Sequence, residues 1–407
     1  MEISKFDKEV APVYNKLITE ATDTYLHAPP DGLDIRGGEL GQWKQDNPTA
    51  PQTARMDHDQ FVHYALKSNR QPMNPVTLAR EALGFEASAT ELDIMAGLQK
   101  AYADLITQYE EHRVDPRGLV TIFEIMHLTE AYIAGYSREV DQVSQKLKAA
   151  APEDKEFIGA ERWNNVLWVP DEGMHDRSLQ YLANTVPGFY NLENFYTDHA
   201  RHMKVGNHID LLDFIMANAY VSLQEDATVV NYENATRIYG PVFGHIIWRL
   251  GQDEARHKKA YRYVQRGFGQ QFPDQTLIAT RDTMNDFGMP GEKGIHNFER
   301  RSGKIGLAGV LDPQGLLRSQ KQLIGYISAG TLTPKTYKGK QAQEELVEGT
   351  YQGAIDLQES AKVVNNGRER AIRIAQKNGR PLPLIIGVTV DANRNTKKLH
   401  FPMSKAA

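Results

Sequence analysis

Apolar residues recur at helical spacing through most of the middle of this chain. Residues 93–108 show this spacing clearly, and Ser88-Ala-Thr-Glu91 just before them has the form of a capping box. The pairs Asp115-Pro116, Pro187-Gly188 and Gly240-Pro241 mark helix boundaries. Together they predict helices over roughly 93–108, 115–149, 154–184, 191–204, 207–238 (opened by Asn207) and 242–267. Long helices joined by short turns predict an all-α bundle.

The two ends of the chain have different patterns. Residues 3–26 predict an amphipathic helix, and the Pro-, Gly- and Asn-rich stretch from 28 to about 75 predicts irregular connections. Beyond residue 275 we expect helices over 341–362 and 366–378, a strand over 384–390 and a returning strand over 397–401.

These patterns predict three regions. Residues 1–89 form an N-terminal helix and irregular segment that pack on the core. Residues 90–274 form a helical bundle, and residues 275–407 form a C-terminal extension with a small β-hairpin.

Composition narrows the chemistry that this chain can carry. It contains no cysteine, which excludes disulfides, zinc–thiolate sites, iron–sulfur clusters and thiol nucleophiles. A protein-bound metal therefore needs carboxylate, imidazole or other oxygen ligands. No phosphate loop, dinucleotide fingerprint or nucleic-acid signature is visible, and no apolar run has the length of a membrane span. The polar, acidic N-terminus lacks a signal core, so we expect a cytoplasmic protein.

Charge is unevenly spread along the chain. Residues 301–407 hold 17 Lys and Arg against 8 Asp and Glu, so the tail is basic although the whole chain carries −5. Two basic segments, 335–340 and 368–377, could meet an acidic protein partner, although a solvated helix face is the favoured explanation for each.

Glutamate and histidine form one ordered pattern across the predicted bundle. Residues three apart on a helix share a face, so Glu172 and His175 can reach one metal together, as can Glu254 and His257. Glu130 and Glu225 lie on the two remaining helices. Four carboxylates and two imidazoles in this order are the ligand set of a di-iron site in a four-helix bundle, although manganese and zinc also accept such ligands.

The first ligand is the least defined member of this set. Glu124 and Glu139 compete with Glu130 on one predicted helix. Glu124-Ile-Met-His127 is a third Glu-x-x-His pair, which shows that a single pair carries little information. His199, His202, His208 and His245 are further histidines that we expect to be structural or exposed.

The sequence around these ligands resembles the soluble acyl-carrier-protein desaturases over roughly residues 90–265. The resemblance rests on Leu223-Gln-Glu-Asp-Ala-Thr228, Asp253-Glu-Ala-Arg-His-Lys-Lys-Ala-Tyr261 and, more loosely, Leu128-Thr-Glu-Ala-Tyr-Ile-Ala-Gly-Tyr-Ser-Arg-Glu139. The last motif favours Glu130 as the first ligand. Trp168 and Glu172-Gly-Met-His175 match the ends of the family's remaining motif but not its middle.

This resemblance implies a fold, a reaction and partners. It implies a ferritin-like helical homodimer with two Fe ions, which uses dioxygen and an external donor such as ferredoxin to desaturate a fatty acyl chain on acyl carrier protein. It also implies that Thr228 assists oxygen activation, and that Asp253 and Trp168 orient a histidine or help electrons reach the iron. The structural alternatives are a hydroxyl bonded to a helix carbonyl, an ordinary helix charge and a core aromatic residue.

Several features depart from that family pattern. Pro170 and Gly173 flank Glu172, so the helix either starts at Pro170, which would displace Trp168, or bends beside the metal. Ala134 stands where the family has proline, and the tail beyond 275 is longer than the family needs. A di-iron monooxygenase (a hydroxylase or N-oxygenase) is therefore an alternative. Iron storage, a radical-generating subunit and a scaffold without turnover fit the chain less well.

Overall fold

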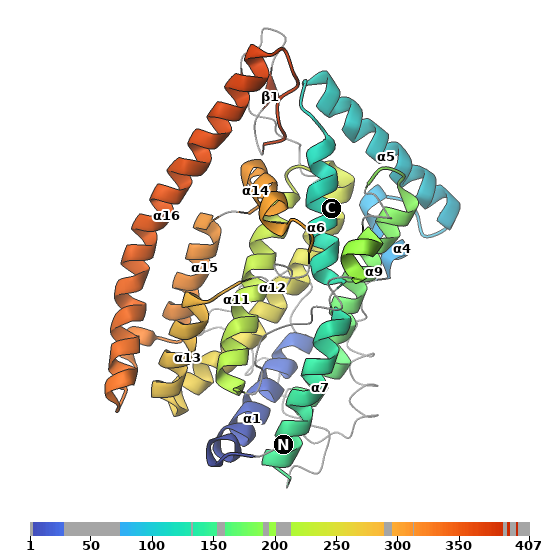
Figure 1. Ribbon diagram of the computed structural model, residues 1–407. Coiled ribbons are helices and arrows are strands. Elements are labelled where there is room, and N and C mark those ends of the chain that lie inside the picture. Colours follow the sequence, from blue (N-terminus) through green and yellow to red (C-terminus); the bar gives the residue numbers. More distant parts are fainter. Residues whose placement is uncertain are drawn as a thin grey trace.

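The prediction of an all-α, ferritin-like bundle is confirmed. The computed structural model describes residues 3–27, 74–131, 133–152, 159–189, 195–200, 213–288, 295–311, 313–385, 389–390 and 396–397. Apart from a two-stranded hairpin, the elements within these ranges are helices (Figure 1).

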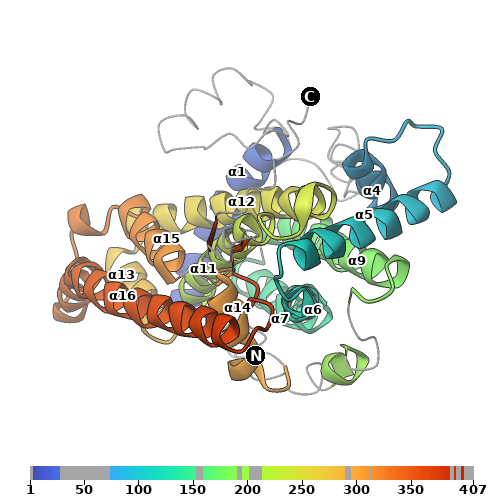
Figure 2. The ribbon, with the colours of Figure 1, turned by 90° about the horizontal axis from the view of Figure 1, so that it is seen from above.

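Four helical segments form the centre of the molecule. They are α6 (Arg117–Glu130), α9 (Val169–Thr185), α11 (Phe214–Ala235) and α12 (Gly240–Gln271). The most extensive helix–helix contact is between α11 and α12, which lie side by side in both ribbon views (Figures 1 and 2). Most positions of α11 are buried, including polar ones, so this helix is enclosed by its neighbours.

Two apolar clusters fill the interior above and below the middle of these helices. On α12, residues up to Leu250 belong to one cluster and residues from Ala260 onward belong to the other. On α11, Val221 belongs to the second cluster and Tyr232 to the first, so the boundary between the clusters lies between these two residues. The glutamates and histidines of the sequence pattern lie between the two clusters, so apolar side chains separate them from solvent at both ends of the bundle.

Further helices cover this centre. The N-terminal helix α1 (Lys5–His27) packs along α12, while α4 (Pro75–Leu83) and α5 (Glu91–Glu111) cover the opposite end. The helix α7 (Ile133–Ala150) follows α6 after a short break.

The C-terminal part adds a helical layer on the α11 side. It consists of α13 (Pro273–Asn285), α14 (Phe298–Ala308), α15 (Pro313–Tyr326), the 3-10 turn η3 (Ala329–Thr331) and α16 (Tyr337–Lys377). The strands β1 (Thr389–Val390) and β2 (Thr396–Lys397) pair antiparallel. No helix among the described residues is long and apolar enough to cross a membrane.

Several predicted boundaries were wrong in detail. The capping box is Thr90 with Asp93, because the Thr90 hydroxyl accepts from the Asp93 N–H, so α5 starts at Glu91. The predicted helix 115–149 is two helices, and the two predicted segments 341–362 and 366–378 are one continuous α16. Helix α4 lies just outside the stretch expected to be irregular, and Asp213, rather than Asn207, caps α11. Asn207 and most of the stretches 28–75 and 191–204 lie outside the described residues.

Pro170 neither starts nor breaks its helix. The short α8 (Ala160–Arg162) continues through the π-helical turn η2 (Trp163–Trp168) into α9, with Pro170 near the start of α9. The Val169 N–H donates to the Asn164 carbonyl, which is the wider spacing of a π turn. The chain thus remains helical through a residue that lacks an N–H, and Trp168 stays on the helix that carries Glu172.

Candidate metal centre

The structure brings all six predicted ligand residues together inside the bundle. Their polar atoms form two overlapping groups, each with all its ligand atoms within 4.8 Å of one another. The first group is Glu130, Glu172, His175 and Glu254; the second is Glu172, Glu225, Glu254 and His257. Glu172 and Glu254 belong to both groups, and none of the six residues exposes more than 7% of its surface. This is the arrangement expected of two adjacent cations bridged by two carboxylates.

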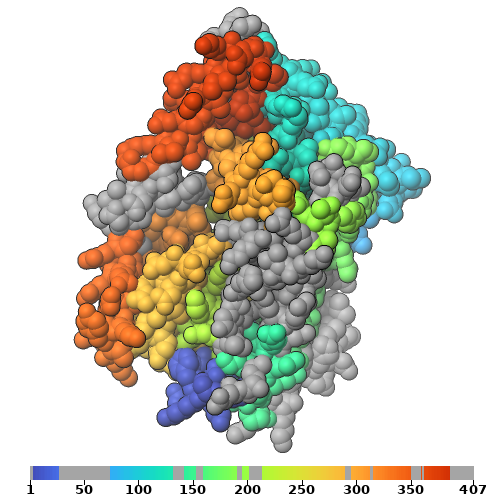
Figure 3. All heavy atoms as spheres, viewed as in Figure 1, coloured from blue at the N-terminus to red at the C-terminus, as the bar shows by residue number. Residues whose placement is uncertain are grey.

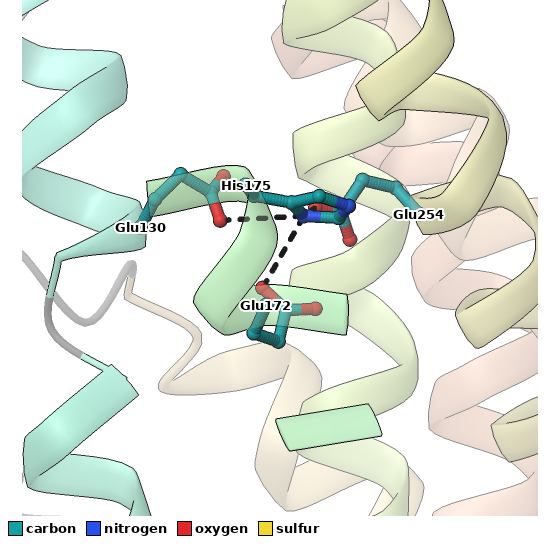
Figure 4. Close-up of side chains that lie close together, drawn as sticks. All are labelled: Glu130, Glu172, His175 and Glu254. Carbon is teal, nitrogen blue, oxygen red and sulfur yellow. Dashed lines mark ion pairs between the residues drawn. The ribbon is translucent and has the colours of Figure 1, made fainter. Parts of the chain in front are cut away.

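The first group surrounds Nδ1 of His175 (Figure 4). This nitrogen lies 3.0 Å from Glu254 Oε1 and 3.6 Å from an oxygen of both Glu130 and Glu172. Glu130 is the last residue of α6, while Glu172 and His175 share one face of α9. Three helices therefore converge on one imidazole nitrogen.

The second group surrounds Nδ1 of His257 in a matching way. This nitrogen lies 2.9 Å from Glu172 Oε1, 3.4 Å from Glu254 Oε2 and 3.6 Å from Glu225 Oε2. The ring centroids of His175 and His257 are 6.0 Å apart. Each imidazole thus contacts both shared carboxylates, Glu172 and Glu254, through its Nδ1 atom.

Burial and mutual repulsion shift the pKa values of these carboxyl groups strongly. Burial, with the charge of Glu254, raises the pKa of Glu130 to about 8 and raises that of Glu225 well above its usual range. Burial opposes ionisation of Glu254 as well, but hydrogen bonding to Glu225 and the charge of His175 hold its pKa below the usual value. Like charges this close cannot all ionise unless cations are present.

The histidines respond in the opposite direction. Burial alone would lower the pKa of His175, but the charge of Glu254 and hydrogen bonds to the surrounding carboxylates raise it well above its usual value. Burial would also lower the pKa of His257, but the electrostatic effect of Tyr25 and hydrogen bonds to Asp171, Glu172 and Glu225 raise it well above its usual value. Protons on the imidazoles thus offset carboxylate charge in the metal-free protein, and bound cations would release them.

The residues fit a pair of divalent cations. Glu172 Oε1, Glu254 Oε1 and both ring nitrogens of His175 are buried, and among the described residues none of these atoms makes a well-aligned hydrogen bond, although ligand atoms of the same cluster lie about them at 2.9 to 3.6 Å. Buried polar atoms are rarely left in this state without a ligand. Oxygen and imidazole donors without thiolate suit iron, manganese or zinc.

Two of the predicted neighbouring residues contact this cluster. The Trp168 indole N–H donates to Glu225 Oε1 at 3.0 Å, and Asp253 Oδ2 lies 3.6 Å from His175 Nε2 while Asp253 also pairs with Arg256. The Thr228 hydroxyl donates to the carbonyl of Gln224 at 3.1 Å, which is the structural alternative foreseen for this residue.

The competing residues lie elsewhere. Glu124 pairs with Arg301 at 2.6 Å, and His127 pairs with Asp176 at 3.0 Å. His245 lies 3.3 Å from Glu81, and the ring of His199 stacks on Phe195. The side chain of Glu139, together with His202 and His208, lies outside the described residues.

Three residues at the site were not predicted from the sequence. Asp171 Oδ2 lies 3.5 Å from His257 Nε2, Tyr25 of α1 contacts both of these residues, and the Tyr232 hydroxyl donates to Glu130. One signal was present, because both halves of the pattern read Asp-Glu-x-x-His: Asp171-Glu-Gly-Met-His175 and Asp253-Glu-Ala-Arg-His257. No local pattern identified Tyr25, which is far away in the chain.

The sequence of this chain is similar to that of known proteins. A family model described as fatty acid desaturase matches residues 99–373. Two Mycobacterium tuberculosis proteins, from strains CDC 1551 / Oshkosh and ATCC 25618 / H37Rv, are each 30% identical to this chain over 96 residues. Both carry the name acyl-carrier-protein desaturase DesA1 as a provisional assignment. The matched stretch is 23% of this chain and only 28% of each relative. Since the family model covers more than half of the sequence, this chain belongs to the fatty acid desaturase family.

Proposed function

We propose that this protein is an oxygen-dependent di-iron desaturase that introduces a double bond into a fatty acyl chain carried as a thioester on acyl carrier protein. The observation that carries the proposal is the pair of buried ligand groups sharing Glu172 and Glu254, in a chain of the fatty acid desaturase family. Two ferrous ions bound there would supply dioxygen activation and an oxidant strong enough for an unactivated carbon chain.

The protein residues orient the ligands and exclude water. Trp168 holds one oxygen of Glu225, and Tyr232 holds one oxygen of Glu130, so each unshared carboxylate has a fixed partner. The apolar clusters on both sides would exclude water from the reaction. In this proposal the Thr228 hydroxyl, three residues after Glu225 on α11, would have to leave the Gln224 carbonyl to assist oxygen activation.

The proposed reaction is balanced by an external donor. The acyl chain loses two hydrogens, and dioxygen takes these together with two electrons and two protons to form two water molecules. A ferredoxin-type protein is the proposed electron donor, and a homodimer is the proposed assembly.

The carrier protein is proposed to dock on the C-terminal helices. Arg370, Arg373 and Lys377 are exposed on α16, and Arg300 and Lys304 are exposed on the adjacent α14. These two helices adjoin on the face shown in Figure 3. Positive charge there would attract an acidic carrier.

Metal content and product mass together test this function. Wild-type protein is loaded with Fe²⁺ anaerobically, reduced, and exposed to dioxygen with acyl-carrier substrate. Loss of two mass units supports desaturation, whereas gain of sixteen supports the alternative, a di-iron monooxygenase.

Glu254→Ala should lose both ions and all turnover, and Glu225→Ala should lose the second ion only, because Glu225 belongs to one group. Glu233→Ala, an exposed position of the same α11, is the matched control. Wild-type metal content and turnover in Glu254→Ala would refute the proposal.

A further inference from the structure

The outer ring nitrogens of the two histidines, their Nε2 atoms, each face an aspartate. Each aspartate belongs to the motif of the other histidine. His175 Nε2 lies 3.6 Å from Asp253, which precedes Glu254 on α12. His257 Nε2 lies 3.5 Å from Asp171, which precedes Glu172 on α9. Each Asp-Glu-x-x-His motif therefore supplies the aspartate that faces the histidine of the other motif.

A tyrosine from the N-terminal helix breaks this symmetry. The Tyr25 hydroxyl lies 3.3 Å from His257 Nε2 and also donates to Asp171 Oδ2. In the first half-site the corresponding contact of Asp253 is with Arg256.

The hydrogen bonds of Tyr25 determine which nitrogen of His257 carries a proton in the metal-bound state. A phenol has one hydrogen, and an ionised carboxylate can only accept. The Tyr25 hydrogen therefore goes to Asp171, and the Tyr25 oxygen accepts from His257 Nε2–H. This leaves the lone pair on Nδ1, which faces Glu172, Glu225 and Glu254.

Packing fixes Tyr25 in this position. Its ring meets Trp163 edge-on at 5.1 Å and lies nearly parallel to the imidazole of His257 at 5.8 Å. The Trp163 indole in turn donates to the Tyr261 hydroxyl at 2.9 Å. Only 3% of Tyr25 is exposed, so its hydroxyl is shielded from bulk water.

We propose that Tyr25 of α1 and Asp171 of α9 are positioning residues that present Nδ1 of His257 to the second metal ion. The N-terminal helix is then part of the metal centre and not only a cover for the bundle. This inference rests on the proposed function, because it requires that the two ligand groups bind metal. Outer partners of this kind commonly contribute about 10- to 100-fold in metal affinity.

The test is titration of full-length protein with Co²⁺, whose visible absorption reports ligand geometry. Wild type should bind two ions per chain. Tyr25→Phe keeps the ring but removes the hydroxyl, and it should weaken one of the two ions by about 10- to 100-fold and change its absorption. Asp171→Asn should act on the same ion, while the other ion keeps its affinity.

The matched control is Tyr263→Phe. The Tyr263 hydroxyl joins α12 to Glu20 of α1, so this variant also loses an α1–α12 hydrogen bond, but away from the ligands. It should bind both ions as wild type does. Equal weakening in Tyr25→Phe and Tyr263→Phe, or wild-type binding by Tyr25→Phe, would overturn the positioning role alone. A wild-type protein that binds no Co²⁺ would overturn the proposed function as well.

Discussion

His175 and His257 have the same surroundings on their inner nitrogen and different ones on their outer nitrogen. Both Nδ1 atoms face three glutamates, and two of these glutamates are common to both rings. The outer side of His257 carries Tyr25 and Asp171, whereas that of His175 faces Asp253. The two halves of the site are therefore alike in ligands and unlike in their outer partners, which predicts two metal affinities that differ.

Trp168 offers a direct test of how a single hydrogen bond acts on the site. Trp168→Phe keeps an aromatic ring but removes the donor to Glu225 Oε1. Leaving a charged acceptor without its partner costs about 1.5–3 kcal/mol, and we expect a similar loss of binding energy for the second ion. Metal titration measures this loss. Undiminished affinity at the second ion would show that Trp168 serves packing only.

Among the elements, the placement of α1 depends on a close approach at the start of α8. Gly159 has φ of +56°, and a Cβ there would lie 2.5 Å from the backbone oxygen of Asn15 in α1. Gly159→Ala should push α1 outward, lower the melting temperature and weaken the ion at His257 through Tyr25.

Gly173 provides the contrast on α9, the helix that carries Glu172 and His175. A Cβ at Gly173 meets nothing within 4 Å. Gly173→Ala should therefore stabilise the protein by about 0.5–1 kcal/mol, since alanine loses less backbone entropy in a helix. Thermal unfolding of Gly159→Ala and of Gly173→Ala measures both changes in stability. A destabilised Gly173→Ala would mean that α9 needs flexibility beside the ligands.

The start of α16 is attached to α13 through one carboxylate. Asp274 accepts from the Lys335 and Thr336 N–H groups at 2.9 Å and 2.8 Å, and from the Thr336 hydroxyl. Burial opposes ionisation, but these hydrogen bonds lower the pKa of Asp274 below 3.8. A lowered carboxyl pKa contributes stability that is present above the unfolded value and is lost as pH falls through the folded value.

Asp274→Asn should therefore lower the free energy of unfolding by about 1–2 kcal/mol near neutral pH. The difference from wild type should stay constant above about pH 5 and should shrink as the pH falls through 3.8 toward the lower pKa of the folded state. Denaturant titrations at several pH values measure this difference. A gap that stays constant below about pH 5 as well would show that the charge of Asp274 is not involved.

For the molecule as a whole, the uneven charge predicts where an acidic partner approaches. Arg370→Glu with Arg373→Glu reverses charge on α16, and Lys8→Glu with Lys16→Glu makes the same net change on α1. The α16 pair should raise KM for the acyl-carrier substrate about tenfold at low salt while kcat stays constant, and added salt should narrow the difference. An equal rise in the α1 pair would point to net charge and not to a docking face.

The helical class and the six clustered residues were predictable from local sequence. Helical periodicity and the i, i+3 spacing of Glu172 with His175 and of Glu254 with His257 are properties of a single helix, so they can be read without knowing the fold. The helix ends were less predictable. Thr90 and Asp93 compete with equally suitable neighbours, and the π turn before Pro170 has no distinct local signal.

Contacts between distant segments required the tertiary structure. Glu124 and Glu130 lie on one helix, and only the placement of Arg301 on α14 shows that Glu124 is engaged elsewhere. Tyr25 reaches His257 across 232 positions of the chain, and Asp171 faces the histidine of the other motif. Helical spacing determines which side chains share a face, so the sequence was sufficient to indicate the ligand types and their order. Which faces meet depends on how helices far apart in the chain pack together, and that packing alone completed the surroundings of the site.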